Sequence, residues 1–390
     1  MTETQKYLKR LMGIVADELE IPDSLYEQAR DRYGAVAEWL QRDASSISKD
    51  DCTVYPQGSF RLGTVVRPPG SDEEYDVDLV CEVNQPKTVE SQRSLKSRVG
   101  QELTAYVEAN RFLSPVEEKK RCWRIDYADD VSFHMDILPA VPEDETTIER
   151  IIEQGVDHSL AQTAIAITDN SHSAYDSLTL LWPSSNPRGF AAWFTSRMRT
   201  SALPRLQELV EAGTYRTVDE IPIFLWKTPL QTALQIMKRH RDLAFTDNPD
   251  EKPISIILTT LAAHAYAGES DLLEALTGML DRMLGFVNDV SPRIPNPVNP
   301  EEDFADAWAT NPRLEDSLSI WHAGICGDLR ALDTLTDPEE VQKFLEERFG
   351  VSVGRGRLED AVPQLQSGTV ATPSPAIHIR KAAPQPWGCV

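Results

Sequence analysis

Two aspartates on one predicted strand are the residues of this chain best suited to chemistry. Residues 75–80 read Tyr-Asp-Val-Asp-Leu-Val, so Asp76 and Asp78 stand two positions apart. Side chains at positions i and i+2 of a strand point to the same face, and the two carboxylates therefore project together. They repel each other unless a cation lies between them. Mg2+ suits such a site, because it is commonly held by one or two carboxylates plus the phosphates of a substrate.

The alternative for this pair is a solvated strand edge. The apolar residues Leu79 and Val80 that follow indicate a buried strand, where unpaired acids would be costly. The composition of the segment therefore favours a metal-binding pair.

A third carboxylate, Asp136, is predicted on a neighbouring strand. Residues 122–127 and 131–138 both have strand composition, and they are joined by an Ala-Asp-Asp turn at 128–130. In two-metal phosphoryl transfer, one cation activates the attacking oxygen and the other holds the leaving oxygen. We expect Asp136 to complete the site of the activating ion. His134 shares its face, and we interpret it as a packing or hydrogen-bonding residue rather than a metal ligand.

A Gly-Ser turn lies shortly before the aspartate pair. Gly58 allows the backbone to approach an anion closely, and Ser59 adds hydroxyl and N–H donors. Gln57 flanks the turn and is a further candidate for contact with phosphate or ribose. A Gly-Ser turn alone is weak evidence, but its position next to Asp76 and Asp78 predicts a triphosphate site.

The longer strings around these residues resemble one family. Residues 56–64 read Pro-Gln-Gly-Ser-Phe-Arg-Leu-Gly-Thr and residues 74–80 read Glu-Tyr-Asp-Val-Asp-Leu-Val. Together with Asp136 they are similar to the bacterial cyclic GMP–AMP synthase and DncV-like nucleotidyltransferases (CD-NTases) of the DNA polymerase β-like superfamily. The likeness continues in four later segments and covers roughly residues 1–350. These segments are 185–190, 234–242, 252–257 and 296–304.

This resemblance implies an α+β fold, with a polymerase β-like nucleotidyltransferase core built on a mixed β-sheet and a helical second lobe. It implies an enzyme that joins nucleoside triphosphates, ATP among them, into a cyclic di- or trinucleotide second messenger in anti-phage (CBASS) defence. Two Mg2+ ions are expected, with Mn2+ as a substitute, and no nucleic-acid activator. By the same resemblance, Lys238 on a helix at 229–244 and Ser255 at the start of a helix at 253–266 grip the donor triphosphate.

Four other functions are alternatives to a cyclic oligonucleotide synthase. A linear oligonucleotide synthase or a protein-nucleotidylating transferase would use the same residues, and both linkages, 2′–5′ and 3′–5′, remain open. A regulatory pseudo-nucleotidyltransferase would have a degraded acid triad, whereas all three acids are present. A templated polymerase is disfavoured by the net charge of −23, because proteins that bind nucleic-acid polymers carry basic patches.

Composition places the chain among ordinary globular proteins. Its 390 residues can form two packed lobes, and its five cysteines contain no Cys-x-x-Cys pair, which argues against a disulfide framework or a zinc site. We find no apolar run long enough for a bilayer and no signal peptide, so the expectation is a cytoplasmic protein without a membrane partner.

The predicted organisation is a core at 1–180 that includes two N-terminal helices (3–20 and 23–42), a helical substrate-binding lobe at 181–355, and a flexible tail at 356–390. The helices expected in the second lobe lie at 187–200, 203–212, 229–244, 253–266, 270–288, 301–309, 312–334 and 337–349. The tail is rich in proline and has Trp387 near its end. We hypothesise that residues 376–390 dock a ubiquitin-transfer-like or HORMA-type regulator, as a short linear motif anchored by an aromatic residue would.

Overall fold

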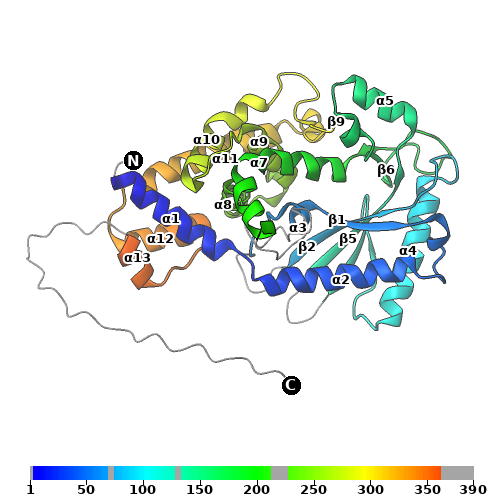
Figure 1. Cartoon of the computed structure of the whole chain (residues 1–390), viewed down its shortest axis with the longest axis horizontal. Helices are drawn as coiled ribbons and strands as arrows, with labels where there is room; N and C mark the ends of the chain where they lie inside the picture. The colour runs from blue at the N-terminus through cyan, green and yellow to red at the C-terminus, as the bar shows by residue number, and fades with distance from the viewer. Residues whose placement is uncertain (1–2, 69–73, 128–132, 212–226, 362–390) are drawn as a thin grey trace, which may run out of the picture.

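The computed structural model describes residues 3–68, 74–127, 133–211 and 227–361. They form a mixed β-sheet packed beside a body of helices (Figure 1). This is the α+β architecture that the sequence predicted. Residues 376–390, for which a partner is predicted, lie outside the described part of the chain.

The sheet has the strand order β1-β2-β5-β4-β3, with β6 and β7 continuing from β5. Strands β2 and β5 are parallel, and the other pairs are antiparallel. The strands are β1 (Thr53–Gln57), β2 (Tyr75–Glu82), β3 (Glu117–Glu118), β4 (Trp123–Tyr127), β5 (Phe133–Pro142), β6 (Ile165–Ile167) and β7 (Ser184–Ser185). The parallel pair places the two predicted acid strands side by side at the centre of the sheet.

Alternation along β2 separates a buried face from a polar face. Val77, Leu79 and Cys81 are at most 1 % exposed, whereas Asp76 is exposed and Asp78 half-buried. The buried face packs against α2 (Asp23–Gln41) and α4 (Gln92–Ala109) in one apolar cluster. Each aliphatic side chain so buried contributes roughly 1.5–3 kcal/mol, which holds the strand in this register and directs the aspartates to the opposite face.

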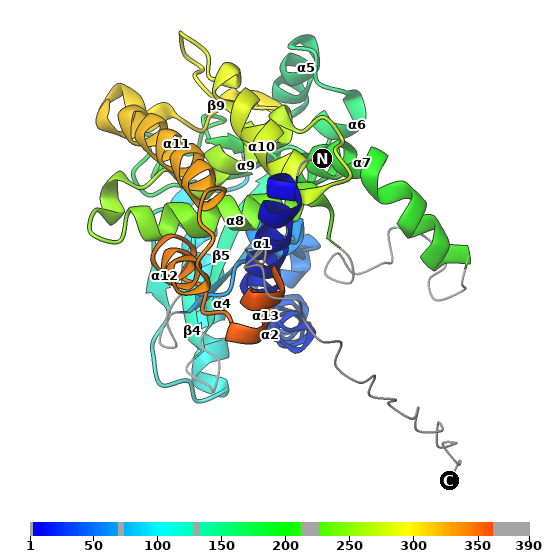
Figure 2. The ribbon, with the colours of Figure 1, turned by 90° about the vertical axis from the view of Figure 1, so that its left-hand side faces the viewer.

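The helical body is organised around α8 (Pro229–Ala244), which begins at the bounds predicted for it. Thr228 and Gln231 form a reciprocal capping box that fixes this start. Figure 2 shows four helices grouped around α8: α1 (Glu3–Leu19), α10 (Leu272–Met283), α11 (Arg313–Leu332) and α12 (Pro338–Phe349). The other helices of this body are α7 (Pro187–Glu211), α9 (Ser255–Ala265) and α13 (Arg355–Ala361), and the smaller α5 (Glu145–Glu153) and α6 (His158–Ala161) also join it.

The packing differs from the predicted organisation at both ends of the described chain. Helix α1 was assigned to the core lobe, but its apolar stripe is buried in the cluster of the helical body. Residues 355–361, mostly within the predicted tail, form helix α13. Leu358 is 2 % exposed there, and Arg357 pairs with Asp17 and Glu18 of α1. An amphipathic stripe predicts that a helix is buried but not which partner covers it.

The helix predicted at 301–309 is wrong in its first half. Residues Asn299–Asp303 form strand β9, paired with β8 (Pro295–Asn296), and a short 3-10 helix, Asp306–Ala309, follows. The Asp303 carboxylate accepts backbone N–H bonds from Arg293 (2.7 Å), Ile294 (3.0 Å) and Ala305 (3.0 Å). These bonds satisfy the loop backbone and outweigh the helical preference of the local composition.

None of the described helices combines the length and apolar character needed to cross a membrane.

Candidate active site

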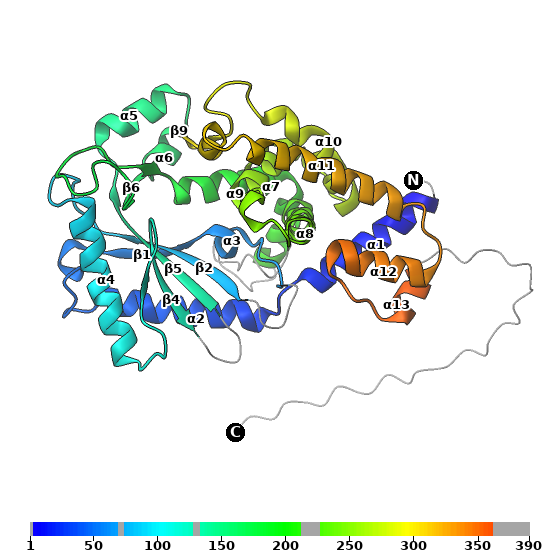
Figure 3. The same ribbon diagram turned by 180° about the vertical axis from the view of Figure 1, so that it is seen from behind.

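The three predicted acids lie on adjacent strands and on the same face of the sheet. Asp78 of β2 is the direct partner of Asp136 in the parallel β2–β5 pair, and Asp76 lies one pleat away. Neighbouring strands are about 4.8 Å apart, so the three carboxylates can share one site. Figures 1 and 3 show the short helix α3 (Gly58–Leu62) between the sheet and α8.

The environment of these acids disfavours their negative charges. Burial, together with the nearby carboxylates of Asp136 and Asp76, raises the pKa of Asp78 to about 7 against the opposing charges of Arg124 and Lys238. Burial also raises the pKa of Asp76, with the charge of Asp136 adding to it. A divalent cation would relieve both the desolvation and the repulsion, so this pair of acids fits a metal ion.

The third acid is held differently. Both oxygens of Asp136 accept hydrogen bonds from Arg124 of β4, at 2.7 Å from Nε and 2.8 Å from Nη2. Within the described ranges, no three His, Cys, Asp or Glu side chains are gathered in an arrangement that could hold a metal ion. The predicted three-carboxylate site is therefore not preformed, because Arg124 is bonded to one of its three carboxylates, that of Asp136.

Sequence reasoning missed Arg124, because the hairpin expected from the sequence has a different register from the one in the structure. The strands at 122–127 and 131–138 were expected to form a hairpin, and the register of a hairpin pairs residues symmetrically about the turn. In the structure, Asp126 is opposite His134 and Arg124 is opposite Asp136. Symmetric pairing about the expected turn at 128–130 would have placed Cys122 opposite Asp136, so the register that brings Arg124 to this acid came from the structure.

The predicted Gly-Ser turn is in contact with the acid pair. Gly58 begins α3 with a φ of +63°, in the left-handed region that favours glycine. A Cβ at this position would lie 2.1 Å from Asp78 Oδ2, far inside van der Waals contact. Gln57 is the direct partner of Asp78 across β1 and β2, and Ser59 is half-buried beside it. The turn and the acids therefore belong to one site.

Lys238 is buried rather than exposed. Its Nζ donates to Thr64 Oγ1 at 2.8 Å and to the Thr64 carbonyl at 3.3 Å, in the loop after α3. Burial, together with the nearby charge of Arg241, lowers the pKa of Lys238 to about 7, while Asp242 and Asp78 oppose this shift. Lys238 thus lies within electrostatic reach of the acid pair and ties α8 to the Gly-Ser turn.

Ser255 belongs to a basic cluster with Arg241 and Lys252. It is the first residue of α9, and its Oγ accepts a hydrogen bond from Arg241 Nη1 at 3.0 Å. Arg241 and Lys252 both pair with Asp242, at 2.6 Å and 3.1 Å. The charge of Lys252 favours ionised Asp76, lowering the pKa of that carboxyl slightly against the effect of burial. The cluster therefore faces the acids, and its signal in the sequence was Lys252, three residues before Ser255.

His134 has the hydrogen-bonding role that was predicted for it. Its Nδ1 is 2.7 Å from Asp126 Oδ1 on β4, and its Nε2 contacts Glu74 at the start of β2. Both ring nitrogens are thus engaged by carboxylates, which leaves neither free to bind a metal in this arrangement.

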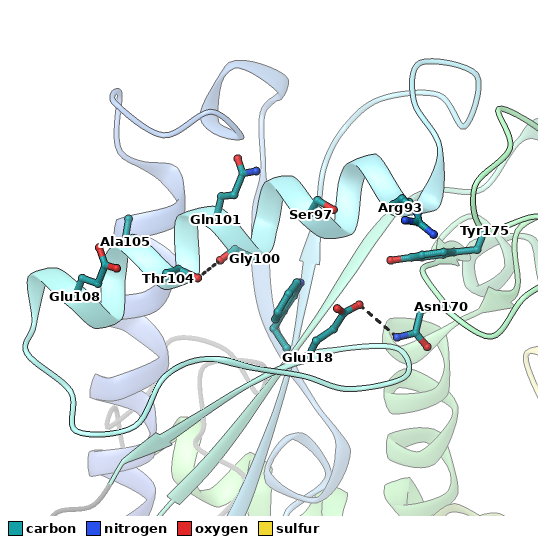
Figure 4. Close-up of a pocket in the computed structure, with 11 residues that line it drawn as sticks. Arg93, Ser97, Gly100, Gln101, Thr104, Ala105, Glu108, Glu118, Asn170 and Tyr175 are labelled. Carbon is teal, nitrogen blue, oxygen red and sulfur yellow. Dashed lines mark hydrogen bonds between the residues drawn. The ribbon is translucent and has the colours of Figure 1, made fainter.

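An open groove of about 850 Å3 lies along α4, and Figure 4 shows its lining. Its walls include Trp123, Tyr175 and Glu118. The ring of Trp123 packs directly on Gly100, and a Cβ at position 100 would lie 2.3 Å from that ring. Trp123 alternates with Arg124 along β4, so the groove is on the opposite face of the sheet from the acids. It does not belong to the candidate active site.

The raised pKa of Asp78 predicts a specific pH dependence of stability. An aspartate titrates near pH 4 in the unfolded chain, but Asp78 titrates at a pKa of about 7 in the folded protein. The folded protein therefore binds more protons between these values, and stability falls as pH rises from 4 to 7. In EDTA at pH 8, Asp78→Asn should raise the free energy of unfolding by about 1–3 kcal/mol. This gain is smaller than the free energy that corresponds to the whole pKa difference, because the site retains contact with solvent.

Denaturant unfolding at pH 4 and at pH 8 checks this prediction. The gain should vanish at pH 4, where the wild-type carboxyl is neutral in both states. Excess Mg2+ at pH 8 should stabilise the wild type but not the variant. An equal gain at both pH values would show that packing, not charge, separates the two proteins.

Comparison with known proteins was made on sequence and on fold. Residues 52–139 match the family model described as "Cyclic GMP-AMP synthase DncV-like, nucleotidyltransferase domain". The chain is 30 % identical over 311 residues to a "c-di-GMP synthase" of Roseivirga ehrenbergii, covering 79 % of this chain and 74 % of that protein. It is 26 % identical over 359 residues to the "Cyclic dinucleotide synthase CdnG" of Bradyrhizobium diazoefficiens, covering 88 % and 80 %.

The solved structure of Bradyrhizobium diazoefficiens CdnG in complex with GTP has the same fold. It superposes with a TM-score of 0.65 at 24 % identity, covering 91 % of this chain and 98 % of that one. The likeness therefore includes the sheet that carries the acids and the helical body that faces them.

Proposed function

Because this chain belongs to the DncV-like nucleotidyltransferases, we propose that it joins two nucleoside triphosphates, with GTP as the principal substrate, into a cyclic dinucleotide. The observation that carries the proposal is the contact of Gly58 with Asp78, whose partner on the next strand is Asp136. The relative described as c-di-GMP synthase and the structure of CdnG in complex with GTP support guanine as the base. ATP, which the sequence resemblance implied, is the competing substrate.

The reaction is nucleotidyl transfer in two rounds. A ribose hydroxyl of the acceptor attacks the α-phosphorus of the donor, the bond from that phosphorus to the bridging oxygen of the β-phosphate breaks, and pyrophosphate leaves. The linear intermediate then turns round, and its own hydroxyl and triphosphate repeat the step. Asp136, on the strand beside Asp78, is placed to accept the hydroxyl proton or to orient the attacking oxygen.

We assign the metal sites to Asp76, Asp78 and Asp136. The Asp78 carboxylate is desolvated and repelled by those of Asp136 and Asp76, and both features favour a divalent cation such as Mg2+, with Mn2+ as a substitute. When bound, the ions would neutralise charge on the phosphates and lower the pKa of the attacking hydroxyl.

The triphosphate would lie between the Gly-Ser turn and the basic cluster on α8 and α9. Ser59 offers a hydroxyl beside Gly58, and Lys238 and Lys252 both lie within electrostatic reach of the acids. Ser255 contributes through its bond with Arg241. Point charges and hydroxyl donors of this kind suit phosphate oxygens. Gln57, at the end of β1, is proposed to contact ribose or phosphate.

Product analysis tests the function. The purified protein is incubated with GTP, ATP or both in Mg2+ or Mn2+, treated with phosphatase and examined by mass spectrometry. We expect a phosphatase-resistant product with the mass of a cyclic dinucleotide, formed from GTP alone. A product that loses terminal phosphate would identify a linear synthase, and a failure to incorporate any nucleotide would identify a pseudo-nucleotidyltransferase.

The place of this reaction in anti-phage defence, and a regulator bound through residues 376–390, are further parts of the proposal. They derive from the sequence resemblance, and the tail residues are outside the described chain. Deleting residues 376–390 should leave synthesis by the purified protein unchanged; a collapse of that synthesis would count against a role in partner binding alone.

A further inference from the structure

The guanidinium of Arg124 lies among the acids to which the metal ions are assigned. Its Nε and Nη2 bond to the two oxygens of Asp136, and Nη2 is also 3.7 Å from Asp76 Oδ1. A planar guanidinium matches a carboxylate with two parallel bonds, which makes this the strongest form of such a pair. Arg124 thus bridges two of the three acids assigned to the metals.

The sheet imposes this contact. Arg124 is the direct partner of Asp136 across β4 and β5, and Asp136 is the direct partner of Asp78 across β5 and β2. The side chains of Arg124 and Asp136 are only 24 % and 19 % exposed, so their pair is screened less than one on the surface. The backbone register therefore keeps one positive charge beside the acids.

The other cations whose charge reaches these acids are engaged elsewhere. Lys238, which affects Asp78, bonds to Thr64. Lys252 and His134, which affect Asp76, pair with Asp242 and Asp126. None of these three donates to the carboxylates themselves. Arg124 is therefore the group that a metal ion would meet at Asp136.

We propose that Arg124 is a positioning residue that competes with the metal ion for Asp136 and yields when a nucleotide phosphate accepts its guanidinium. The proposal rests on the assignment of the three acids as metal ligands. A guanidinium binds phosphate with the same two-bond geometry that it uses for carboxylate. Ion binding at Asp136 and triphosphate binding are then coupled, and each strengthens the other. In the enzyme without nucleotide, Arg124 thus holds the Asp136 carboxylate in place while no ion is bound to it.

Binding of Mn2+ to the nucleotide-free protein, measured by electron paramagnetic resonance of the free ion, tests this coupling without any synthesis. Arg124→Gln should bind the ion about tenfold more tightly than the wild type, because Asp136 no longer has an internal partner. Arg124→Lys, which keeps the charge without the two-bond geometry, should fall between them. The matched control is Arg121→Gln, near the start of the same strand, where the guanidinium pairs with Asp169. It should change affinity by no more than about twofold.

A double variant separates competition from general electrostatics. If Arg124 acts through Asp136, Arg124→Gln should give no gain in an Asp136→Asn background. A non-hydrolysable GTP analogue should raise Mn2+ affinity more in the wild type than in Arg124→Gln. Equal ion affinity in wild type and Arg124→Gln would overturn the proposal, and so would a gain that persists without Asp136. Failure to form a cyclic product would instead count against the proposed function, because these measurements involve no turnover.

Discussion

Replacing Asp76 and Asp78 together by alanine is expected to lower the rate of nucleotide joining at least about 1,000-fold while the fold survives. Both carboxylates lie on the polar face of β2, and neither contributes to the apolar cluster beneath the sheet. The pKa values of both are raised by burial and by the charge of Asp136, so their removal relieves an unfavourable interaction in the metal-free protein. The variant should lose chemistry and keep its stability.

Pyrophosphate release in a single turnover, together with denaturant unfolding, measures the two effects. Asp126→Ala is the matched control, since Asp126 is an acid on the same face of the sheet that bonds to His134 instead. It should retain synthesis within about threefold of the wild type, as expected for a residue outside the reacting groups. Residual synthesis within about tenfold of the wild type in the double variant would remove both aspartates from the metal site.

Gly58→Ala is expected to reduce synthesis at least about 100-fold, because the new side chain displaces the Asp78 carboxylate although it takes no part in the reaction itself. The new Cβ would lie 2.1 Å from Asp78 Oδ2 and 3.0 Å from its Cγ, so Asp78 or the turn has to move. The φ of +63° adds backbone strain of about 1 kcal/mol for any residue with a Cβ. The rate should fall far more than the loss of stability alone would explain.

Gly155→Ala separates the two causes. Gly155 also has a positive φ, +93°, but a Cβ there would meet nothing within 4 Å. This control should lose about 1 kcal/mol of stability and keep its rate of synthesis. If the two variants lost activity equally, strain rather than contact with Asp78 would be the cause, and the turn would lose its proposed role beside the acids.

Much of the fold could be predicted from local patterns. The alternation in β2 and the three- and four-residue spacing in α1 and α8 are properties of short segments, because side-chain direction repeats every 2 residues in a strand and every 3.6 in a helix. The bounds of α8 agree with those predicted, and those of α1 and α2 agree to within one residue. Local pattern failed at 301–309, where Asp303 bonds to backbone groups of a loop that begins ten residues earlier.

The acid pair and the Gly-Ser turn could be predicted from the sequence for the same reason. The shared face of Asp76 and Asp78 follows from the geometry of one strand, and a glycine next to a serine marks a close approach of the backbone. These inferences need no knowledge of what packs against the segment.

Only the tertiary structure decided how the other site residues are bound. Arg124 meets Asp136 because β4 and β5 pair in one register, and Lys238 is buried because α8 packs against the loop after α3. Ser255 bonds to Arg241 because α8 and α9 lie side by side. The chain thus determined which groups can do chemistry through periodicities within single segments. Their partners and charges were set by contacts between segments far apart in sequence, which local spacing does not contain.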